Sequence, residues 1–265
     1  MQRYALTIEY IGTNFAGSQK QPGDTITNKD KSTSPKTTIQ GELEKALSTL
    51  TKQNIKTIFS GRTDAGVHSK GQIVHFDTDY DCSNSRFLYA LNCLLPKEIS
   101  VHELKKKEKT FHAQKSARKR WYRYTIINRK HRSAWDKECL FIKDELNIQR
   151  MNDSLSFIIG EHDFSSFKKA NTENPAKICN VYKAECFKDN DKVIIDIIAN
   201  RFLYNMVRSI VGTLLMIERK SLAPETLKEI LTAKDRSKAG PTISPEGLTL
   251  MKVFYEEQEK YGDSL

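Results

Sequence analysis

The sequence predicts an α+β fold in which two successive halves repeat a similar order of strands and helices. Short segments alternate apolar and polar residues with the period of a half-buried strand. Longer segments between them carry an apolar stripe with the period of a helix. The length of 265 residues suits one large domain or two halves of ordinary domain size. We place the boundary after residue 108, which gives an N-terminal half 1–108 and a C-terminal half 109–265.

The N-terminal half alternates strands with helices. In its first strand Tyr4, Leu6 and Ile8 share one face, which is typical of a half-buried strand. The expected strands are 4–10, 55–60, 72–78 and 99–104, and the expected helices are 40–52 and 87–95. This β-α-β-β-α-β order is typical of a ferredoxin-like unit. After the first strand, the polar stretch from Lys20 to Thr38 indicates a surface loop, whose lysines either touch phosphates or are simply solvated.

The C-terminal half follows a similar alternation. Its expected strands are one around Tyr122, 178–187, 193–199 and one near Leu248. Its expected helices are 151–159, 224–233 and, between 199 and 224, one with the apolar stripe Val207, Ile210, Val211 and Leu214. Between the first helix and the next strand lies the segment 161–167. His162 and Asp163 could indicate acid–base chemistry, but we expect a loop that local hydrogen bonds stabilise.

The charge balance indicates a polyanionic partner. The formal net charge is +10, from 43 Lys and Arg against 33 Asp and Glu, and such an excess is typical of nucleic-acid binders. A basic surface that only keeps the protein soluble is the alternative. The stretch from Lys105 to Arg120 is either a solvated linker or a basic stripe over an RNA backbone. The following strand, 118–127, interleaves cations with aromatic residues, as base stacking needs, although an ordinary sheet-surface strand would also fit.

Composition argues against several other classes of protein. The five cysteines are odd in number and form no Cys-x-x-Cys pair, so we expect reduced thiols, no metal site and no disulfide framework. No apolar run approaches the eighteen or so residues of a membrane span. The chain enters a strand pattern almost at Met1, so we expect no signal peptide. A cytoplasmic location is the expectation.

The first candidate for chemistry is Asp64, in the octapeptide Gly61-Arg62-Thr63-Asp64-Ala65-Gly66-Val67-His68. An acid between two glycines at the end of a strand lies where the backbone must turn sharply. Loops of this kind often present reactive side chains from a rigid scaffold. Asp-Ala-Gly by itself is also ordinary turn chemistry, because Asp caps its own backbone and Gly accepts a positive φ.

The complete octapeptide resembles the signature of the pseudouridine synthases that modify the anticodon arm of transfer RNA. Other segments are similar to motifs of the same family: the loop 10–19, Tyr122-Arg123-Tyr124, Asp163-Phe164-Ser165-Ser166-Phe167, Met206-Val207-Arg208 and Gly247-Leu248-Thr249-Leu250. The resemblance extends from Tyr4 to about Tyr255. One departure is Ser18, which stands where the family commonly has Trp or Phe and so removes an aromatic packing contact.

The resemblance implies a fold, a reaction and partners. The implied fold has two ferredoxin-like or RRM-like halves, joined into a mixed, mostly antiparallel sheet with flanking helices around a central basic cleft. The implied reaction isomerises uridine to pseudouridine at positions 38, 39 and 40 of tRNA and is carried out by a homodimer. Breaking the bond between base and sugar and rejoining the base through carbon involves neither redox chemistry nor hydrolysis, so no cofactor or metal is demanded.

The resemblance also implies roles for five residues, and the chemistry of the reaction suggests one for Arg62. Asp64 is the catalytic residue, Tyr122 lies against the target base, and Arg208 pairs with Asp64. Leu248 and Leu250 wall the pocket behind the base. Arg62 either enters the vacated base stack or binds a phosphate. Tyr124 shares the strand face of Tyr122, so it either extends the aromatic wall or belongs to the core.

Three alternatives remain open at this stage. A catalytically silent RNA-binding protein could use two RRM-like halves, but it would not need the acid of the octapeptide. An aspartic hydrolase would need a second, facing Asp-x-Gly turn, from the same chain or a dimer mate. A pseudouridine synthase for another RNA would look much the same. The chemical route also stays open, because Asp64 could attack the base, attack the sugar or remove a sugar proton.

Overall fold

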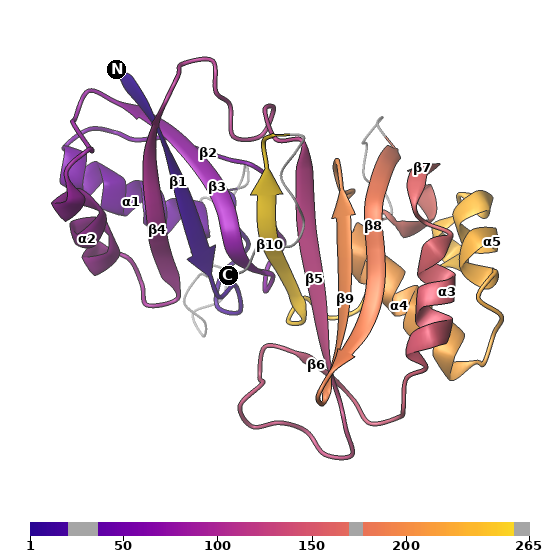
Figure 1. Cartoon of the computed structure of the whole chain (residues 1–265). Coiled ribbons are helices and arrows are strands. Elements are labelled where there is room, and N and C mark those ends of the chain that lie inside the picture. The colour runs from indigo at the N-terminus through magenta and orange to yellow at the C-terminus, as the bar shows by residue number, and fades with distance from the viewer. Residues whose placement is uncertain (21–36, 170–176, 257–265) are drawn as a thin grey trace, which may run out of the picture. The chain divides into compact units, whose positions relative to one another are not determined.

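The computed structural model describes residues 1–20, 37–169 and 177–256. The chain forms two compact units (Figure 1). Unit 1 comprises Met1–Ala117 together with the chain from Leu250 onward, and unit 2 comprises Arg118–Thr249. Most of the loop expected from Lys20 to Thr38 lies outside the described residues.

Unit 1 contains the strand and helix order that the sequence predicts. Its elements are β1 (Gln2–Tyr10), α1 (Ile39–Thr51), β2 (Thr57–Phe59), β3 (His68–Thr78), α2 (Ser85–Leu94) and β4 (Ile99–Lys107). The strands run in the order β4-β1-β3, with antiparallel pairing, and β2 pairs with β3. Within this unit the last strand, β10 (Leu248–Phe254), lies beside β3, where Ser69 Oγ donates to the carbonyl of Leu250 at 3.2 Å.

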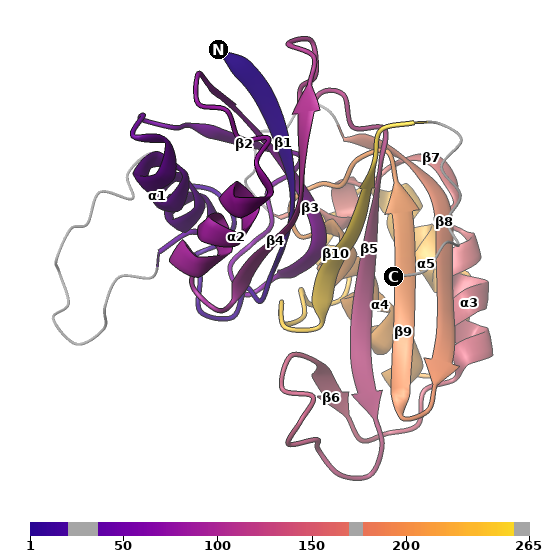
Figure 2. The same ribbon diagram turned by 60° about the vertical axis from the view of Figure 1, so that its left-hand side comes forward.

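Burial of one sheet face explains why these segments fold as they do. The alternating residues Leu6 and Ile8 of β1 are fully buried, and so are Leu43 and Leu47 from the stripe of α1. They belong to one apolar core to which both helices contribute. Figure 2 shows α1 and α2 on the same side of strands β1, β3 and β4. Burial of this apolar surface is the main force that stabilises unit 1.

Unit 2 has its own set of paired strands and helices. Its elements are β5 (Lys119–Asn128), β6 (Leu140–Ile142), α3 (Ile148–Ser156), β7 (Gly160–Asp163), a 3₁₀ turn (Ser165–Phe167), β8 (Ile178–Asp189), β9 (Lys192–Ala199), α4 (Met206–Arg219), α5 (Thr226–Ala233) and a second 3₁₀ turn (Arg236–Lys238). The strand order is β5-β9-β8-β7, and only β6 among the paired strands described for this unit runs parallel to its neighbour, β5. The start of β10 also belongs here, and Thr125 N donates to Gly247 O beside it at 2.9 Å.

The structure confirms the predicted fold class, an α+β chain with mixed, mostly antiparallel strands. The prediction of a hydrogen-bonded loop at 161–167 was wrong for residues 161–163, which pair with β8 as part of the short strand β7 (Gly160–Asp163). The expected local hydrogen bonds are present, since Asp163 Oδ1 accepts from the backbone N–H and the hydroxyl of Ser165. None of the helices in the described part of the chain is long and apolar enough to cross a bilayer.

Candidate active site

Asp64 lies in the loop that connects β2 to β3. The side chain of Arg62 is exposed, Thr63 is buried and Asp64 is half-buried, so the backbone alternates as an extended segment does. The chain then turns: Val67 N donates to Asp64 O at 3.1 Å, and Gly66 has a φ of 81°. A positive φ favours glycine here. The loop therefore presents Asp64 at a sharp corner, as the sequence predicted.

Three hydrogen bonds hold Thr63, the residue before Asp64. The N–H of Thr63 donates to Ser18 Oγ at 2.8 Å, and the carbonyl of Thr63 accepts from the N–H of Ser18 at 3.1 Å. The hydroxyl of Thr63 is 2.8 Å from the phenol oxygen of Tyr10. Burial raises the pKa of Tyr10, so this phenol stays neutral near pH 7. Thr63 is thus held in place, and it supports the turn that presents Asp64.

Two glycines let the loop after β1 pack directly on the Asp64 loop. A Cβ atom on Gly12 would lie 2.0 Å from the carbonyl oxygen of Val67, which no side chain tolerates. Gly17 has a φ of 107°, and a Cβ there would lie 3.1 Å from the carbonyl oxygen of Thr63. The N–H of Gly12 also donates to His68 Nδ1 at 3.0 Å. The two loops are therefore packed backbone against backbone.

A buried glutamine secures the entry to the Asp64 loop. Gln72, on β3, donates through Nε2 to the carbonyl of Gly61 at 2.9 Å. Its Oε1 accepts from the hydroxyl of Ser60. Since β3 is part of the sheet, these bonds tie the first residues of the loop to a rigid element.

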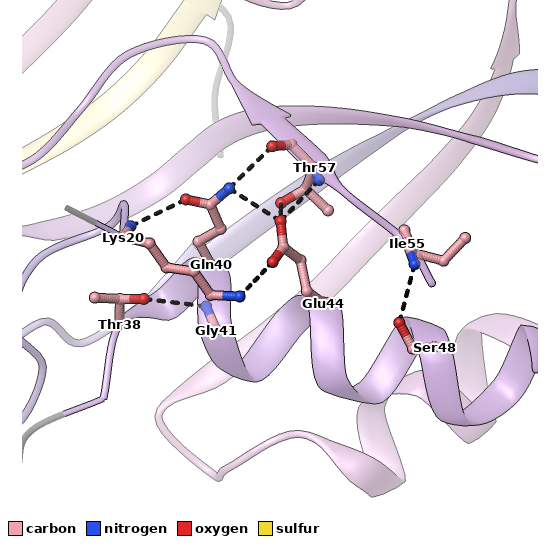
Figure 3. A network of polar contacts seen from close by, with 8 residues as sticks. All are labelled: Lys20, Thr38, Gln40, Gly41, Glu44, Ser48, Ile55 and Thr57. Atoms are coloured by element: carbon pink, nitrogen blue, oxygen red, sulfur yellow. Dashed lines mark hydrogen bonds and ion pairs between the residues drawn. The ribbon is translucent and has the colours of Figure 1, made fainter. Parts of the chain in front are cut away.

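Figure 3 shows how the strand that leads into this loop is attached to α1. Glu44 Oε1 accepts from the N–H of Thr57 at 2.9 Å and from Gln40 Nε2 at 3.0 Å. Its other oxygen pairs with Lys20 Nζ at 2.5 Å. Burial raises the pKa of Glu44, but the hydrogen bonds from Lys20, Thr57 and Gln40 outweigh it, so the pKa lies below its ordinary value. The ionised carboxylate fixes the start of β2.

Tyr122 lies on β5 in unit 2. Its ring packs edge to face against Phe202, with 5.0 Å between ring centroids. Tyr124, two residues further on, is fully buried, and its hydroxyl donates to the carbonyl of Ser244 at 2.9 Å. Burial raises the pKa of Tyr124 to about 12. Tyr124 is therefore a core residue, which decides between the two readings that the sequence left open.

Arg208 lies in the first turn of α4 and is held by local partners. Its Nε donates to the carbonyl of Ile243 at 2.7 Å, and its Nη1 donates to Asn205 Oδ1 at 3.1 Å. Asn205 precedes the helix and has a left-handed φ of 67°. Two fixed acceptors restrict the guanidinium to one direction, so it is oriented rather than a freely rotating surface charge.

The six candidate residues divide between the two units. Arg62, Asp64 and Leu250 belong to unit 1, and Tyr122, Arg208 and Leu248 belong to unit 2. The structure places Arg62 and Asp64 on one loop. It places Leu248 and Leu250, both buried, on the same strand, β10.

The basic segments have partly structural uses. Lys105–Lys107, expected in the link between halves, lies in β4, so this part of the expectation was wrong. On β5, Arg123 binds the buried carboxylate of Asp196 through two hydrogen bonds, each 2.8 Å long. Its guanidinium also lies over the ring of Trp121, 5.2 Å from the centroid. Arg123 therefore stabilises the sheet surface, which favours the structural reading of this residue.

The residues that hold the Asp64 loop were not predicted from the sequence. Ser18 was noted only as a lost aromatic contact, whereas its hydroxyl is a hydrogen-bond partner of the loop. Tyr10 and Gln72 were taken simply as strand residues. Buried polar side chains in a strand were the available signal, because such groups need partners. Within the described residues, no three or more His, Cys, Asp or Glu side chains gather as metal ligands would.

The chain is similar to known tRNA pseudouridine synthases over nearly its whole length. The family model described as tRNA pseudouridine synthase matches residues 6–114 and 157–256. The tRNA pseudouridine synthase A of Anoxybacillus flavithermus is 40% identical over 265 residues, which cover 97% of this chain and 100% of that protein. The enzyme of the same name from Bacillus subtilis is 40% identical over 257 residues, which cover 96% and 99%.

These matches confirm the predicted enzyme class, an isomerase of the pseudouridine synthase type. The chain belongs to the tRNA pseudouridine synthase family. Tyr122 lies outside both segments that the family model matches, and the other five candidate residues lie inside them. A solved structure of an archaeal box H/ACA Nop10-Cbf5 complex aligns over 89% of this chain and 60% of that chain, with 8% identity and a TM-score of 0.35, which is too low to carry a structural argument.

Proposed function

We propose that the protein isomerises uridine to pseudouridine in the anticodon stem-loop of tRNA, at positions 38, 39 and 40, with Asp64 as the essential group. Membership of the tRNA pseudouridine synthase family carries this proposal. The net charge of +10 suits a polyanionic substrate. The rigid corner that presents Asp64 suits a group that must meet one atom of a bound nucleotide.

The chemistry assigns Asp64 an ionised carboxylate. The bond between N1 of uracil and the ribose breaks, the base turns, and a bond from C5 to the ribose forms. The C5 proton leaves and N1 takes up a proton, so that the product is an isomer of uridine. Attack on the base, attack on the sugar and removal of a sugar proton all begin from the carboxylate. In the RNA complex we propose that Arg208 pairs with Asp64, because a cation within a few ångströms favours the ionised form.

The remaining candidate residues act on the base and the backbone. A paired uridine must leave the stack before it can react, at a cost of a few kcal/mol. Stacking on Tyr122 returns about 1–3 kcal/mol of that cost. We assign Leu248 and Leu250 to the apolar wall behind the detached uracil. Arg62, exposed on the loop of Asp64, binds a phosphate or fills the vacated stack.

The partners and location follow from the same proposal. A homodimer that grips tRNA across both subunits is implied by the resemblance, and sedimentation of the purified protein tests it. The proposed location is the cytoplasm, where the substrate tRNA is found. Fractionation of cells that express a tagged chain tests the location.

The deciding experiment compares Asp64→Asn with the unaltered protein. Tritium release from tRNA labelled at C5 of uridine measures turnover, and filter binding measures affinity. We expect turnover to fall by more than about a thousandfold, since the reaction needs the carboxylate, and affinity to stay within about threefold. The matched control is Asp235→Asn, a turn aspartate that accepts from Ser237 N, which should turn over normally. Normal turnover by Asp64→Asn would refute the assignment.

A second set of substrates tests the target. Three tRNAs that carry uridine at only position 38, 39 or 40 should each release tritium. A tRNA with cytidine at all three positions should release none. If the last tRNA is modified as fast as the others, the protein is a pseudouridine synthase with another target.

A further inference from the structure

Ser18 holds the backbone beside Asp64 from two directions. Its side chain is 0% exposed. Its Oγ accepts from the N–H of Thr63 at 2.8 Å, and its own N–H donates to the carbonyl of Thr63 at 3.1 Å. One buried residue therefore satisfies both backbone polar groups of the residue that precedes Asp64.

Planarity of the peptide bond carries this restraint to Asp64. The carbonyl of Thr63 lies in the same rigid plane as the nitrogen and Cα of Asp64. The N–H of Thr63 lies in the preceding plane, which also contains Cα of Arg62. Bonds from Ser18 to both groups fix both planes, and so they fix where the side chain of Asp64 leaves the backbone.

Ser18 is itself anchored to a regular element. The N–H of Gln40, in the first turn of α1, donates to the carbonyl of Ser18 at 2.9 Å. The N–H of Ile39 donates to the carbonyl of Gly17 at 3.2 Å. The loop after β1 therefore links Thr63 to α1 through hydrogen bonds, so the helix helps to fix where Thr63 lies. A Trp or Phe side chain at position 18 offers no oxygen to the N–H of Thr63, so this restraint depends on the serine hydroxyl of this chain.

We propose that Ser18 is a positioning residue for the reaction, because its hydroxyl fixes the backbone that presents Asp64. The proposal rests on the catalytic role of Asp64 proposed above. Ser18 does not touch the substrate in this account. It acts only through Thr63, so its removal should slow the chemical step and leave RNA affinity unchanged.

The test is Ser18→Ala, which keeps the bond from the N–H of residue 18 to the carbonyl of Thr63. It removes both bonds of the hydroxyl, which accepts from the N–H of Thr63 at 2.8 Å and donates to the carbonyl of Thr63 at 3.4 Å. Single-turnover tritium release should slow by about 10–100-fold, because a misplacement of about 1 Å costs that much, while the Kd for tRNA stays within about threefold. Ser18→Thr, which keeps the Oγ acceptor, should recover most of the rate. The matched control is Ser48→Ala, since Ser48 Oγ also accepts a backbone N–H, that of Ile55, at 3.1 Å. Ser48 lies in the last turn of α1, whereas the loop that carries Ser18 bonds to the first turn. Ser48→Ala should keep the wild-type rate.

The outcomes separate this proposal from the proposed function. If Asp64→Asn is inactive and Ser18→Ala keeps the wild-type rate, the positioning role is refuted and the function stands. If Asp64→Asn turns over normally, the function itself fails. A slow Ser18→Ala whose loss matches a fall in melting temperature, and whose rate Ser18→Thr does not restore, would show a merely structural serine. Melting curves of the Ser18 and Ser48 variants supply that comparison.

Discussion

The buried imidazole of His75 accepts a hydrogen bond from the backbone N–H of Ala113, with 3.1 Å between nitrogens. The carbonyl of the same alanine accepts from the hydroxyl of Tyr255 at 2.8 Å. Ala113 is also fully buried. Two side chains therefore fasten Ala113 to the rest of unit 1, so at this residue the stretch from Lys105 to Arg120 is packed rather than solvated.

This bond predicts a pH dependence of stability. Burial, assisted by the charges of Arg3 and His112, lowers the pKa of His75 to about 4 from the ordinary 6.5. Between these values a proton binds the unfolded chain but not the folded one, so stability falls as pH falls. From pH 7 to pH 5 the loss is roughly 2 kcal/mol.

His75→Asn tests this dependence, because Asn Oδ1 can accept the same N–H but does not titrate. Urea unfolding at pH 7 and pH 5 should show a loss that is smaller in the variant by about 2 kcal/mol. His131→Asn, which alters an exposed histidine, should behave as the unaltered protein does. Equal pH dependence in His75→Asn and the unaltered protein would contradict the prediction.

The pair of Arg123 and Asp196 predicts a large effect on unfolding. Asp196→Ala leaves the guanidinium without its two acceptors, and breaking a buried pair in this way costs about 3–5 kcal/mol. Replacing both residues, as Arg123→Met with Asp196→Ala, should cost less than Asp196→Ala alone, because no unpaired charge remains. Urea unfolding of the unaltered protein, of Asp196→Ala and of the double variant measures both losses. A loss in the double variant that equals or exceeds that of Asp196→Ala would show that the unpaired charge is not the source.

Local patterns explain which parts of the structure could be predicted. Alternation in β1 is visible because its alternate residues are buried in one core. Strand β7 was missed because Glu161-His162-Asp163 has no apolar residue, and only its pairing with β8 makes it a strand. The Asp64 corner was predicted from contiguous residues. The bond from Ser18 to Thr63 was not, because it joins residues 45 positions apart through one side chain and leaves no periodic signal.

The attachment of β2 to α1 predicts unequal effects for the two ends of one ion pair. The side chain of Lys20 is 53% exposed and that of Glu44 is 12% exposed. Lys20→Ala should cost less than about 1 kcal/mol, as exposed pairs do. Glu44→Ala also leaves the buried N–H of Thr57 without its hydrogen-bond acceptor. It should therefore lower the free energy of unfolding by about 2–3 kcal/mol. Thermal and urea unfolding of both variants test the difference, and equal losses would show that the ion pair, rather than the bond to Thr57, matters.

A glycine in α4 gives a prediction in which two effects have opposite signs. Replacing a helical glycine by alanine stabilises an isolated helix by about 1 kcal/mol. A Cβ atom on Gly212, however, would lie 1.8 Å from the carbonyl oxygen of Pro241. That segment continues to Ile243, whose carbonyl holds Arg208. Because backbone must move to make room, Gly212→Ala should be destabilising by about 1–3 kcal/mol and should slow turnover by displacing Arg208.

The matched control for Gly212→Ala is Gly41→Ala in α1. A Cβ atom there would meet side-chain atoms rather than backbone, Thr38 Oγ1 at 3.3 Å and Lys20 Cε at 3.5 Å. This change should be neutral or stabilising by up to about 1 kcal/mol, since the helix propensity then decides the sign. Urea unfolding and tritium release measured on both variants separate packing from propensity. If Gly212→Ala were as stable and active as Gly41→Ala, the segment 240–243 would have to yield without cost, and its role in holding Arg208 would be wrong.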